Sequence, residues 1–211
     1  MTILQVDQLT KKIKGMPIIQ DVSFKLDEGQ IVGLVGANGA GKTTLMKVIL
    51  GLSNYQDGSY KVRANTNNKS NTGALIESPG VYPFLTGYDN LKLLCESKEK
   101  NAIDDIVKKL KMDRYIHKKA KTYSLGMKQK LGIAIAFLNH PQLIVLDEPM
   151  NGLDPKAVRD VRELIVETAK QGTTFLISSH ILSELVKITD SILIIDAVSY
   201  THLRAHETRG N

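Results

Sequence analysis

Apolar residues follow two patterns along the chain, and the order of these patterns predicts the fold. Residues 3–9 (ILQVDQL) and the first half of residues 22–36 (VSFKLDEGQIVGLVG) alternate apolar and polar positions, which predicts strands with one buried face. The second half of that segment and residues 143–149 (LIVLDEP) and 173–180 (TTFLISSH) are continuous apolar runs that end in glycine or polar residues. Such runs are typical of strands that are buried on both faces.

Segments with the helical spacing of apolar residues separate these strands. They are predicted at residues 42–50, 156–171 and 181–189, and a longer helical region extends over residues 87–138. Since strands buried on both faces alternate with helices, we predict an α/β fold with a mainly parallel sheet covered by helices. The alternating strands at the start predict an N-terminal antiparallel β subdomain. The helical region predicts an inserted helical subdomain at about residues 80–140.

Composition narrows the possible classes of protein. The 211 residues are 42% hydrophobic and 24% charged, which fits one globular domain with a substantial core. No run approaches the roughly 20 apolar residues that cross a bilayer, and we expect no signal peptide. Cys95 is the single cysteine, so an internal disulfide is excluded and a reducing compartment is favoured.

The net charge of +6 is compatible with nucleic acid, an anionic membrane surface or an anionic ligand as partner. The densest basic run, residues 108–121, contains apolar residues at helical spacing and is interpreted as the solvated face of a helix and the loop after it. It lacks the interleaved aromatic residues that stack on bases, so no nucleic acid is expected as a partner.

A glycine-rich loop carries the clearest chemical motif. Residues 36–43, GANGAGKT, match the pattern G-x-x-x-x-G-K-[ST] and lie between a predicted buried strand and a predicted helix. In such a loop, backbone N–H groups surround the β- and γ-phosphates, the lysine reaches them and the hydroxyl can bind Mg²⁺. A ligand-free strand–helix turn is the alternative, and the context favours a P-loop NTPase core that binds a nucleoside triphosphate. The candidate nucleotide-binding residues are Gly36, Asn38, Gly39, Ala40, Gly41, Lys42, Thr43 and Thr44.

Two carboxylates and one histidine follow buried strands. Asp147 and Glu148 end the run LIVLDEP, and the carboxyl edge of an open α/β sheet is where ligands bind. We predict that Asp147 helps to hold Mg²⁺ and that Glu148 is the general base for an attacking water. His180 ends the next strand at the same edge, so contact with the γ-phosphate is predicted. The alternatives are an acidic turn and a surface histidine.

Four motifs in order carry a resemblance to a known family. GANGAGKTT, SLGMKQK, LIVLDEPMNGLDP and SSH resemble the motifs of the nucleotide-binding subunit of ATP-binding cassette (ABC) transporters, over residues 1–196. The resemblance implies an ATPase that uses ATP and Mg²⁺. It also implies a second ABC ATPase subunit, in a homodimer formed on ATP binding, and a separate ABC-2-type transmembrane permease that meets the helical subdomain. The location implied is peripheral, on the cytoplasmic face of the membrane.

The resemblance also assigns roles to the second glycine-containing loop. Ser124 and Gly126 belong to the family's signature motif, which caps the γ-phosphate held by the P-loop of the other subunit. Asp154 would lie in the dimer-contact loop beside Glu148. Two departures from the family pattern concern this chemistry: Glu77 stands where a glutamine is usual and is a candidate metal ligand with Thr43 and Asp147, and Leu125 replaces the first signature glycine.

Other features refine the assignment. Ile13 stands about where an aromatic residue commonly stacks on adenine. Residues 73–91 and 123–134 are most similar to the bacitracin- and lantibiotic-resistance exporters of Gram-positive bacteria, which predicts peptide-antibiotic export or resistance. The alternatives are a soluble ABC ATPase acting on nucleic acid or ribosomes, and an idle regulatory cassette. Residues 197–211 show no apolar periodicity and no family resemblance, so we expect a non-family tail on a truncated C-terminus. An artefactual origin is favoured, and a genuine polar tail is the alternative.

Overall fold

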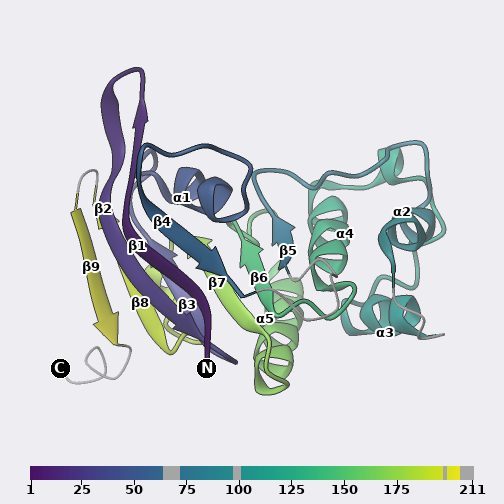
Figure 1. Ribbon diagram of the computed structural model, residues 1–211. Helices are drawn as coiled ribbons and strands as arrows, with labels where there is room; N and C mark the ends of the chain where they lie inside the picture. The colour runs from purple at the N-terminus through teal and green to yellow at the C-terminus, as the bar shows by residue number, and fades with distance from the viewer. Residues whose placement is uncertain (64–71, 97–100, 197–198, 205–211) are drawn as a thin grey trace.

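The computed structural model describes residues 1–63, 72–96, 101–196 and 199–204, which form two sheets and the helices around them (Figure 1). The strands are β1 (Thr2–Ile13), β2 (Met16–Asp27), β3 (Ile31–Val35), β4 (Asp57–Val62), β5 (Thr72–Leu75), β6 (Leu143–Leu146), β7 (Thr174–Ser179), β8 (Ser191–Asp196) and β9 (Ser199–Arg204). The helices are α1 (Lys42–Ile49), α2 (Gly87–Leu94), α3 (Ala102–Lys109), the 3₁₀ helix η1 (Ala120–Thr122), α4 (Leu125–Phe137), α5 (Pro155–Lys170) and α6 (Leu182–Leu185).

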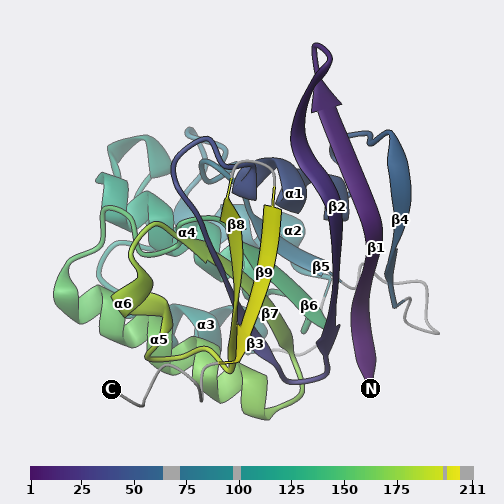
Figure 2. The same ribbon diagram turned by 90° about the vertical axis from the view of Figure 1, so that its left-hand side faces the viewer.

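The predicted antiparallel start of the chain is a three-stranded sheet with the order β2-β1-β4 (Figure 2). Its alternating residues place Leu4, Val6 and Leu9 in a buried core, where they pack with Leu45 and Met46 of α1. Helix α1 is therefore covered on one side by this sheet and on the other by the larger sheet.

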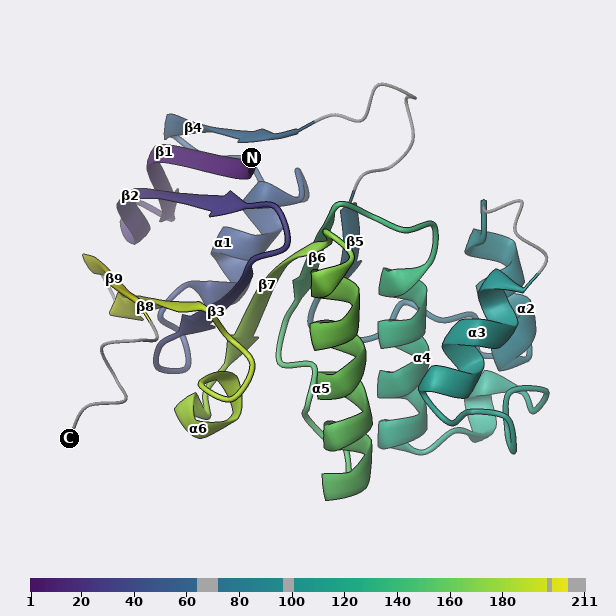
Figure 3. The same ribbon diagram turned by 90° about the horizontal axis from the view of Figure 1, so that it is seen from below.

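The larger sheet has the strand order β5-β6-β7-β3-β8-β9 and is parallel from β5 to β8. Successive residues of β6 face opposite cores, because side chains alternate across a strand. Leu143 and Val145 lie in the core with α1, whereas Ile144 and Leu146 lie in the core under α4 and α5, which cover the other face (Figure 3). These two buried faces explain the continuous apolar runs, and the predicted α/β fold class is confirmed.

The predicted helical region is divided into shorter helices. Helices α2, α3 and α4 lie together at one end of the larger sheet (Figure 1), where they bury Leu91, Ile106 and Leu131. Turns rather than a helix occupy most of residues 110–119. Among the described residues, no helix is both long enough and apolar enough to cross a membrane.

Two segments at the end of the chain differ from the prediction. The helix predicted at residues 181–189 is confined to α6, and turns occupy residues 186–188. Asp190, immediately before β8, accepts a hydrogen bond from the Ile31 N–H at 2.8 Å. Residues 199–204 form β9, antiparallel to β8, which satisfies backbone groups that β8 would otherwise leave unpaired. Residues 199–204 show no apolar periodicity that would predict this strand. The rest of the expected tail, residues 197–198 and 205–211, lies outside the described residues.

Candidate nucleotide-binding and catalytic site

The glycine-rich loop joins the carboxyl end of β3 to α1, and two of its glycines have backbone conformations that other residues rarely adopt. Gly39 and Gly41 have φ values of 84° and 100°. A Cβ atom on Gly41 would lie 2.8 Å from the carbonyl oxygen of Ile18, which is closer than real Cβ contacts. The loop therefore approaches β2 closely at a residue without a side chain.

We expect Gly41→Ala to weaken ATP binding about tenfold and to lower the free energy of unfolding by at least about 1 kcal/mol, because left-handed backbone is costly for an L-residue. Isothermal titration with an ATP analogue and urea denaturation would measure both effects. Gly80→Ala is the matched control, since a Cβ there meets no atom within 4 Å. Wild-type affinity in Gly41→Ala would mean that the conformation of this loop is unimportant for binding.

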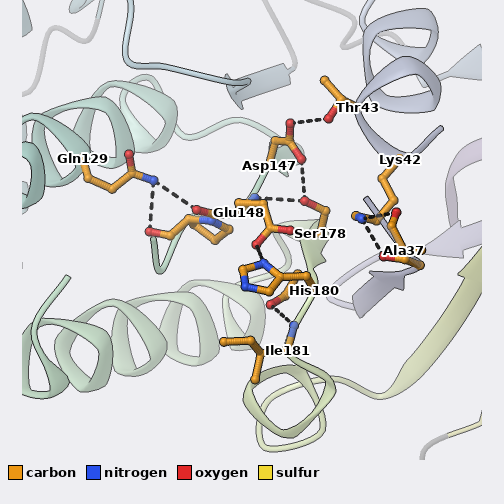
Figure 4. A network of polar contacts seen from close by, with 12 residues as sticks. Ala37, Lys42, Thr43, Gln129, Asp147, Glu148, Ser178, His180 and Ile181 are labelled. Atoms are coloured by element: carbon orange, nitrogen blue, oxygen red, sulfur yellow. Dashed lines mark hydrogen bonds and ion pairs between the residues drawn. The ribbon is translucent and has the colours of Figure 1, made fainter. Parts of the chain in front are cut away.

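Lys42 is the first residue of α1 and is buried, with a relative exposure of 7%. Its ammonium group donates hydrogen bonds to the carbonyl oxygens of Gly36 at 2.7 Å and Ala37 at 3.1 Å (Figure 4). No side chain caps the N-terminus of α1, whose first turn also lacks an acidic residue. The loop thus combines a cation with unpaired backbone N–H donors, which is the chemistry that binds phosphate.

Asp147 is held between two hydroxyl groups directly after β6. Its Oδ2 accepts a hydrogen bond from Thr43 at 2.7 Å, and its Oδ1 accepts one from Ser178 at 2.5 Å (Figure 4). Thr43 lies at the start of α1 and Ser178 lies on β7, so three segments far apart in the sequence meet at this carboxylate. With an exposure of 6%, Asp147 has a fixed orientation.

The pair Thr43 and Asp147 fits Mg²⁺. Both residues offer oxygen, which Mg²⁺ prefers, and their side-chain oxygens are already adjacent. Within the described residues, no group of three or more histidine, cysteine and acidic side chains could enclose a metal ion. A site with one carboxylate and one hydroxyl suits an ion that keeps several waters and binds substrate phosphates.

Glu148 has an unusual backbone and a well-defined partner. Its φ is 49°, in the left-handed region, and its N–H donates to Ser178 Oγ at 2.9 Å. Its Oε2 lies 2.8 Å from Nδ1 of His180 (Figure 4). Because an ionised carboxylate can only accept hydrogen bonds, Nδ1 carries the hydrogen, and the imidazole fixes the direction of the carboxylate.

The strand order explains why these side chains meet. Strand β7 lies between β3, which carries the P-loop, and β6, which carries Asp147 and Glu148. The carboxyl ends of all three strands share one edge, so Lys42, Asp147 and His180 come from adjacent strands or the loops after them. Ligands of open α/β sheets bind at this edge.

Glu77 has a different partner from the other two predicted metal ligands, Thr43 and Asp147, which are hydrogen-bonded to each other. Its carboxylate forms an ion pair with Lys47 of α1 at 2.6 Å, and its side chain is 62% exposed. A surface pair of this kind contributes at most about 1 kcal/mol to stability, so the carboxylate can leave it easily. The structure brings Thr43 and Asp147 together directly, but Glu77 is joined to them only through α1.

Ser124 is the N-cap of α4. Its hydroxyl accepts a hydrogen bond from the Met127 N–H at 3.3 Å, and Leu125 beside it is 68% exposed. Within the described part of the chain, the hydrogen bonds of Ser124 stay within its own helix and none reaches the P-loop. Gly126 packs against the turn after Glu148, since a Cβ on it would lie 2.8 Å from the carbonyl oxygen of Gly152.

Two residues at this site were not predicted from the sequence to have a role of their own. Ser178 joins Asp147 to the backbone of Glu148, and Gln129 donates to the carbonyl oxygens of Glu148 and Pro149. The signal for Gln129 was weak: a polar residue that is buried in a helix whose inner face is otherwise apolar.

Asp154, predicted in the dimer-contact loop, caps α5. Its carboxylate accepts a hydrogen bond from the Ala157 N–H at 2.9 Å, and this backbone bond is the main cause that lowers the pKa of Asp154 below its ordinary value of 3.8. A lowered pKa in the folded state means that the charged cap adds stability above the unfolded-state pKa. That stability is lost as the pH falls through the folded-state pKa.

We therefore expect Asp154→Ala to lower the urea midpoint at about pH 7, and we expect the difference from wild type to narrow on acidification to about pH 3. Urea denaturation at both pH values would measure it. An equal difference at both pH values would contradict a role for the charge in capping.

Known proteins with related sequences match most of the chain. The family model described as ABC transporter matches residues 19–151. The ABC transporter ATP-binding protein YdbJ of Bacillus subtilis is 41% identical over 92% of this chain and 66% of its own length. The bacitracin transport ATP-binding protein BcrA of Enterococcus faecalis is 38% identical over 90% of this chain, which spans 65% of BcrA. The lantibiotic transport ATP-binding protein SrtF of Streptococcus pyogenes is 37% identical over 90% of this chain and 85% of its own length.

Solved structures agree with the fold. A structure described as an ATP binding subunit of an ABC transporter superposes with a TM-score of 0.88 at 28% identity, covering 98% of this chain and 92% of that one. The dimeric structure of MJ0796, a bacterial ABC transporter cassette, superposes with a TM-score of 0.85 at 21% identity, over 96% and 98% of the two chains.

Proposed function

This chain belongs to the ABC transporter family of ATP-binding proteins, and we propose that it hydrolyses ATP, with Mg²⁺, to drive a separate membrane permease. The observation that carries the proposal is the meeting of Lys42, Asp147 and Glu148 at one edge of the sheet. A phosphate-binding cation, a magnesium ligand and a base are the parts that phosphoryl transfer to water requires.

We propose a step for each side chain. Lys42 exchanges the carbonyl oxygens of Gly36 and Ala37 for the oxygens of the β- and γ-phosphates, and the P-loop N–H groups bind the same oxygens. Thr43 and Asp147 would hold Mg²⁺, which would neutralise negative charge on the phosphates. Glu77 would reach this ion, or a water bound to it, after releasing Lys47.

Glu148 acts on the water. Its carboxylate accepts a proton as the water oxygen attacks the γ-phosphorus, and the bond from that phosphorus to the β–γ bridging oxygen breaks, giving ADP and phosphate. His180 holds the carboxylate through the 2.8 Å contact, and we propose that it also contacts the γ-phosphate. The hydroxyl of Ser178 donates to the carboxylate of Asp147 and accepts from the N–H of Glu148, so it fixes the two residues relative to each other.

The proposal includes a second copy of the chain. Among the described residues, the hydrogen bond of the Ser124 hydroxyl stays within α4, and a Cβ on Gly126 would meet the carbonyl oxygen of Gly152. We assign both residues to the γ-phosphate held by the partner subunit. The exposed start of α4 presents the hydroxyl and backbone N–H groups that such a contact requires. Each homodimer, formed on ATP binding, would then hold two composite sites.

We further propose that the permease is of the ABC-2 type, that it exports a peptide antibiotic, and that this subunit works on the cytoplasmic face of the membrane. The support comes from two relatives, the bacitracin transport protein BcrA and the lantibiotic transport protein SrtF. The same relatives favour transport over an action on nucleic acid or ribosomes.

The test is phosphate release from ATP by the purified chain. We expect a slow rate that EDTA abolishes, and we expect Lys42→Ala to bind a labelled ATP analogue about 10- to 100-fold more weakly, since charge-assisted bonds to phosphate are lost. Lys25→Ala is the control, because Lys25 is an exposed lysine on β2. Unchanged affinity in Lys42→Ala, or hydrolysis that survives EDTA, would refute the assignment.

A further inference from the structure

Gln129 is a buried amide that faces the turn after β6. Its side chain is on α4, its exposure is 7%, and its Nε2 lies 3.2 Å from the carbonyl oxygens of both Glu148 and Pro149 (Figure 4). The two N–H donors of the amide serve two acceptors, whereas its oxygen in the same place would repel both. The contact links α4 to the backbone of Glu148 across 19 residues of sequence.

The backbone that Gln129 holds is strained. Glu148 has a φ of 49°, a region that costs a residue with a side chain about 1–3 kcal/mol and persists only where neighbours enforce it. Ser178 accepts from the N–H of Glu148, and Gln129 donates to its carbonyl oxygen, which also accepts from the Asn151 N–H at 3.2 Å. The peptide groups on both sides of Glu148 are thus fixed from opposite directions.

Helix α4 touches the same turn a second time, through its first residues. A Cβ on Gly152 would lie 2.7 Å from Cδ2 of Leu125, and one on Gly126 would meet the carbonyl oxygen of Gly152. The start of α4 therefore contacts the turn around Glu148 at the surface, beside the buried contact that Gln129 makes. Since packed interiors transmit small shifts, a displacement of α4 would reach this turn through Gln129.

We propose that Gln129 is a positioning residue for the general base: it keeps Glu148 in the left-handed conformation that aims the carboxylate at the nucleotide. The inference rests on the proposed function and deepens it. Ser124, on the same helix, is assigned to the partner subunit's nucleotide. Gln129 therefore couples two events on the same chain. One is the contact of its Ser124 loop with the partner subunit's nucleotide, and the other is the placement of Glu148 at its own nucleotide.

The test compares two substitutions of matched length in the full chain. Gln129→Met removes both donors and keeps the bulk, and we expect kcat to fall about 10- to 100-fold with KM for ATP unchanged, because a misplaced catalytic group costs rate rather than binding. Gln129→Glu turns acceptor oxygens toward the two carbonyl groups, so its loss in kcat should be larger. Gln171→Met is the control, since Gln171 is exposed at the end of α5.

ATP-dependent dimerisation is a second readout. It separates a role of Gln129 in positioning Glu148 from a role in stabilising α4 alone. With Glu148→Gln added, Gln129→Met should form the ATP-dependent dimer as readily as Glu148→Gln does. Wild-type kcat in Gln129→Met, or a loss of ATP affinity or dimerisation that accompanies the fall in kcat, would overturn the inference. If Gln129→Met does not fold, the same three measurements on Gln129→Glu (kcat, ATP affinity and ATP-dependent dimerisation) decide whether the inference stands. Absence of hydrolysis in the wild type would instead refute the proposed function.

Discussion

Glu148→Gln is expected to lower the rate of ATP hydrolysis by about 10²- to 10⁴-fold, the range that a positioned general base contributes, while ATP affinity stays near that of wild type. The amide keeps the shape of the side chain and can still accept the hydrogen bond from His180, but it cannot take a proton from water. The bound nucleotide should therefore persist, and the ATP-bound dimer should accumulate.

Single-turnover hydrolysis and light scattering with ATP would measure the two effects on the same samples. Glu163→Gln is the matched control, because Glu163 is an exposed residue of α5 whose carboxylate pairs with Arg159. Hydrolysis by Glu148→Gln at close to the wild-type rate would remove Glu148 from the mechanism. Loss of ATP binding in the same variant would mean that the carboxylate supports the fold of the site.

Ser124→Arg is the second change with a large expected effect. The substitution leaves Lys42, Thr43 and Asp147 intact, so ATP affinity of the monomer should be unchanged. A bulky side chain where the partner's phosphate must pack should nevertheless lower hydrolysis by at least about 10²- to 10³-fold, as loss of one phosphate donor does. The variant also loses the cap that bonds the Met127 N–H, so its thermal unfolding must be recorded.

Equilibrium binding of a fluorescent ATP analogue, phosphate release and ATP-dependent dimerisation together test this variant. Ser59→Arg, on the exposed strand β4, controls for the added charge and bulk. Unchanged hydrolysis and dimerisation in Ser124→Arg would show that the loop only caps α4.

Much of the core could be predicted from the sequence because it depends on local signals. The buried strands of the parallel sheet are continuous apolar runs, and the P-loop is a contiguous motif that ends a strand and begins a helix. The carboxyl edge of the sheet then places Asp147 and His180 near the P-loop. These inferences need only the order of the strands and helices and the direction of the strands.

Other features depend on contacts that periodicity does not record. Gln129 and Ser178 reach Glu148 over 19 and 30 residues of sequence, and nothing local marks them as its partners. The ion pair of Glu77 with Lys47 also depends on how β5 lies beside α1. Strand β9 has no apolar alternation and forms because β8 offers an unpaired edge.

The central claim is that each catalytic site joins the P-loop of one copy to the Ser124 loop of another, and mixing two inactive variants tests it most directly. Lys42→Ala removes the lysine from one site of a mixed dimer, and Ser124→Arg blocks that same site from the other copy. The remaining site pairs the intact P-loop of the Ser124→Arg copy with the intact signature loop of the Lys42→Ala copy.

Phosphate release should therefore reappear when the two purified variants are mixed with ATP and Mg²⁺. If equal amounts pair at random, about half of all dimers contain one copy of each variant, and each of these dimers carries one intact site. Crosslinking of differently tagged copies, measured on the same mixtures, reports whether the mixed dimer forms. Our account predicts activity in proportion to the mixed dimer. A mixed dimer that forms on ATP but releases no more phosphate than either variant alone would contradict it.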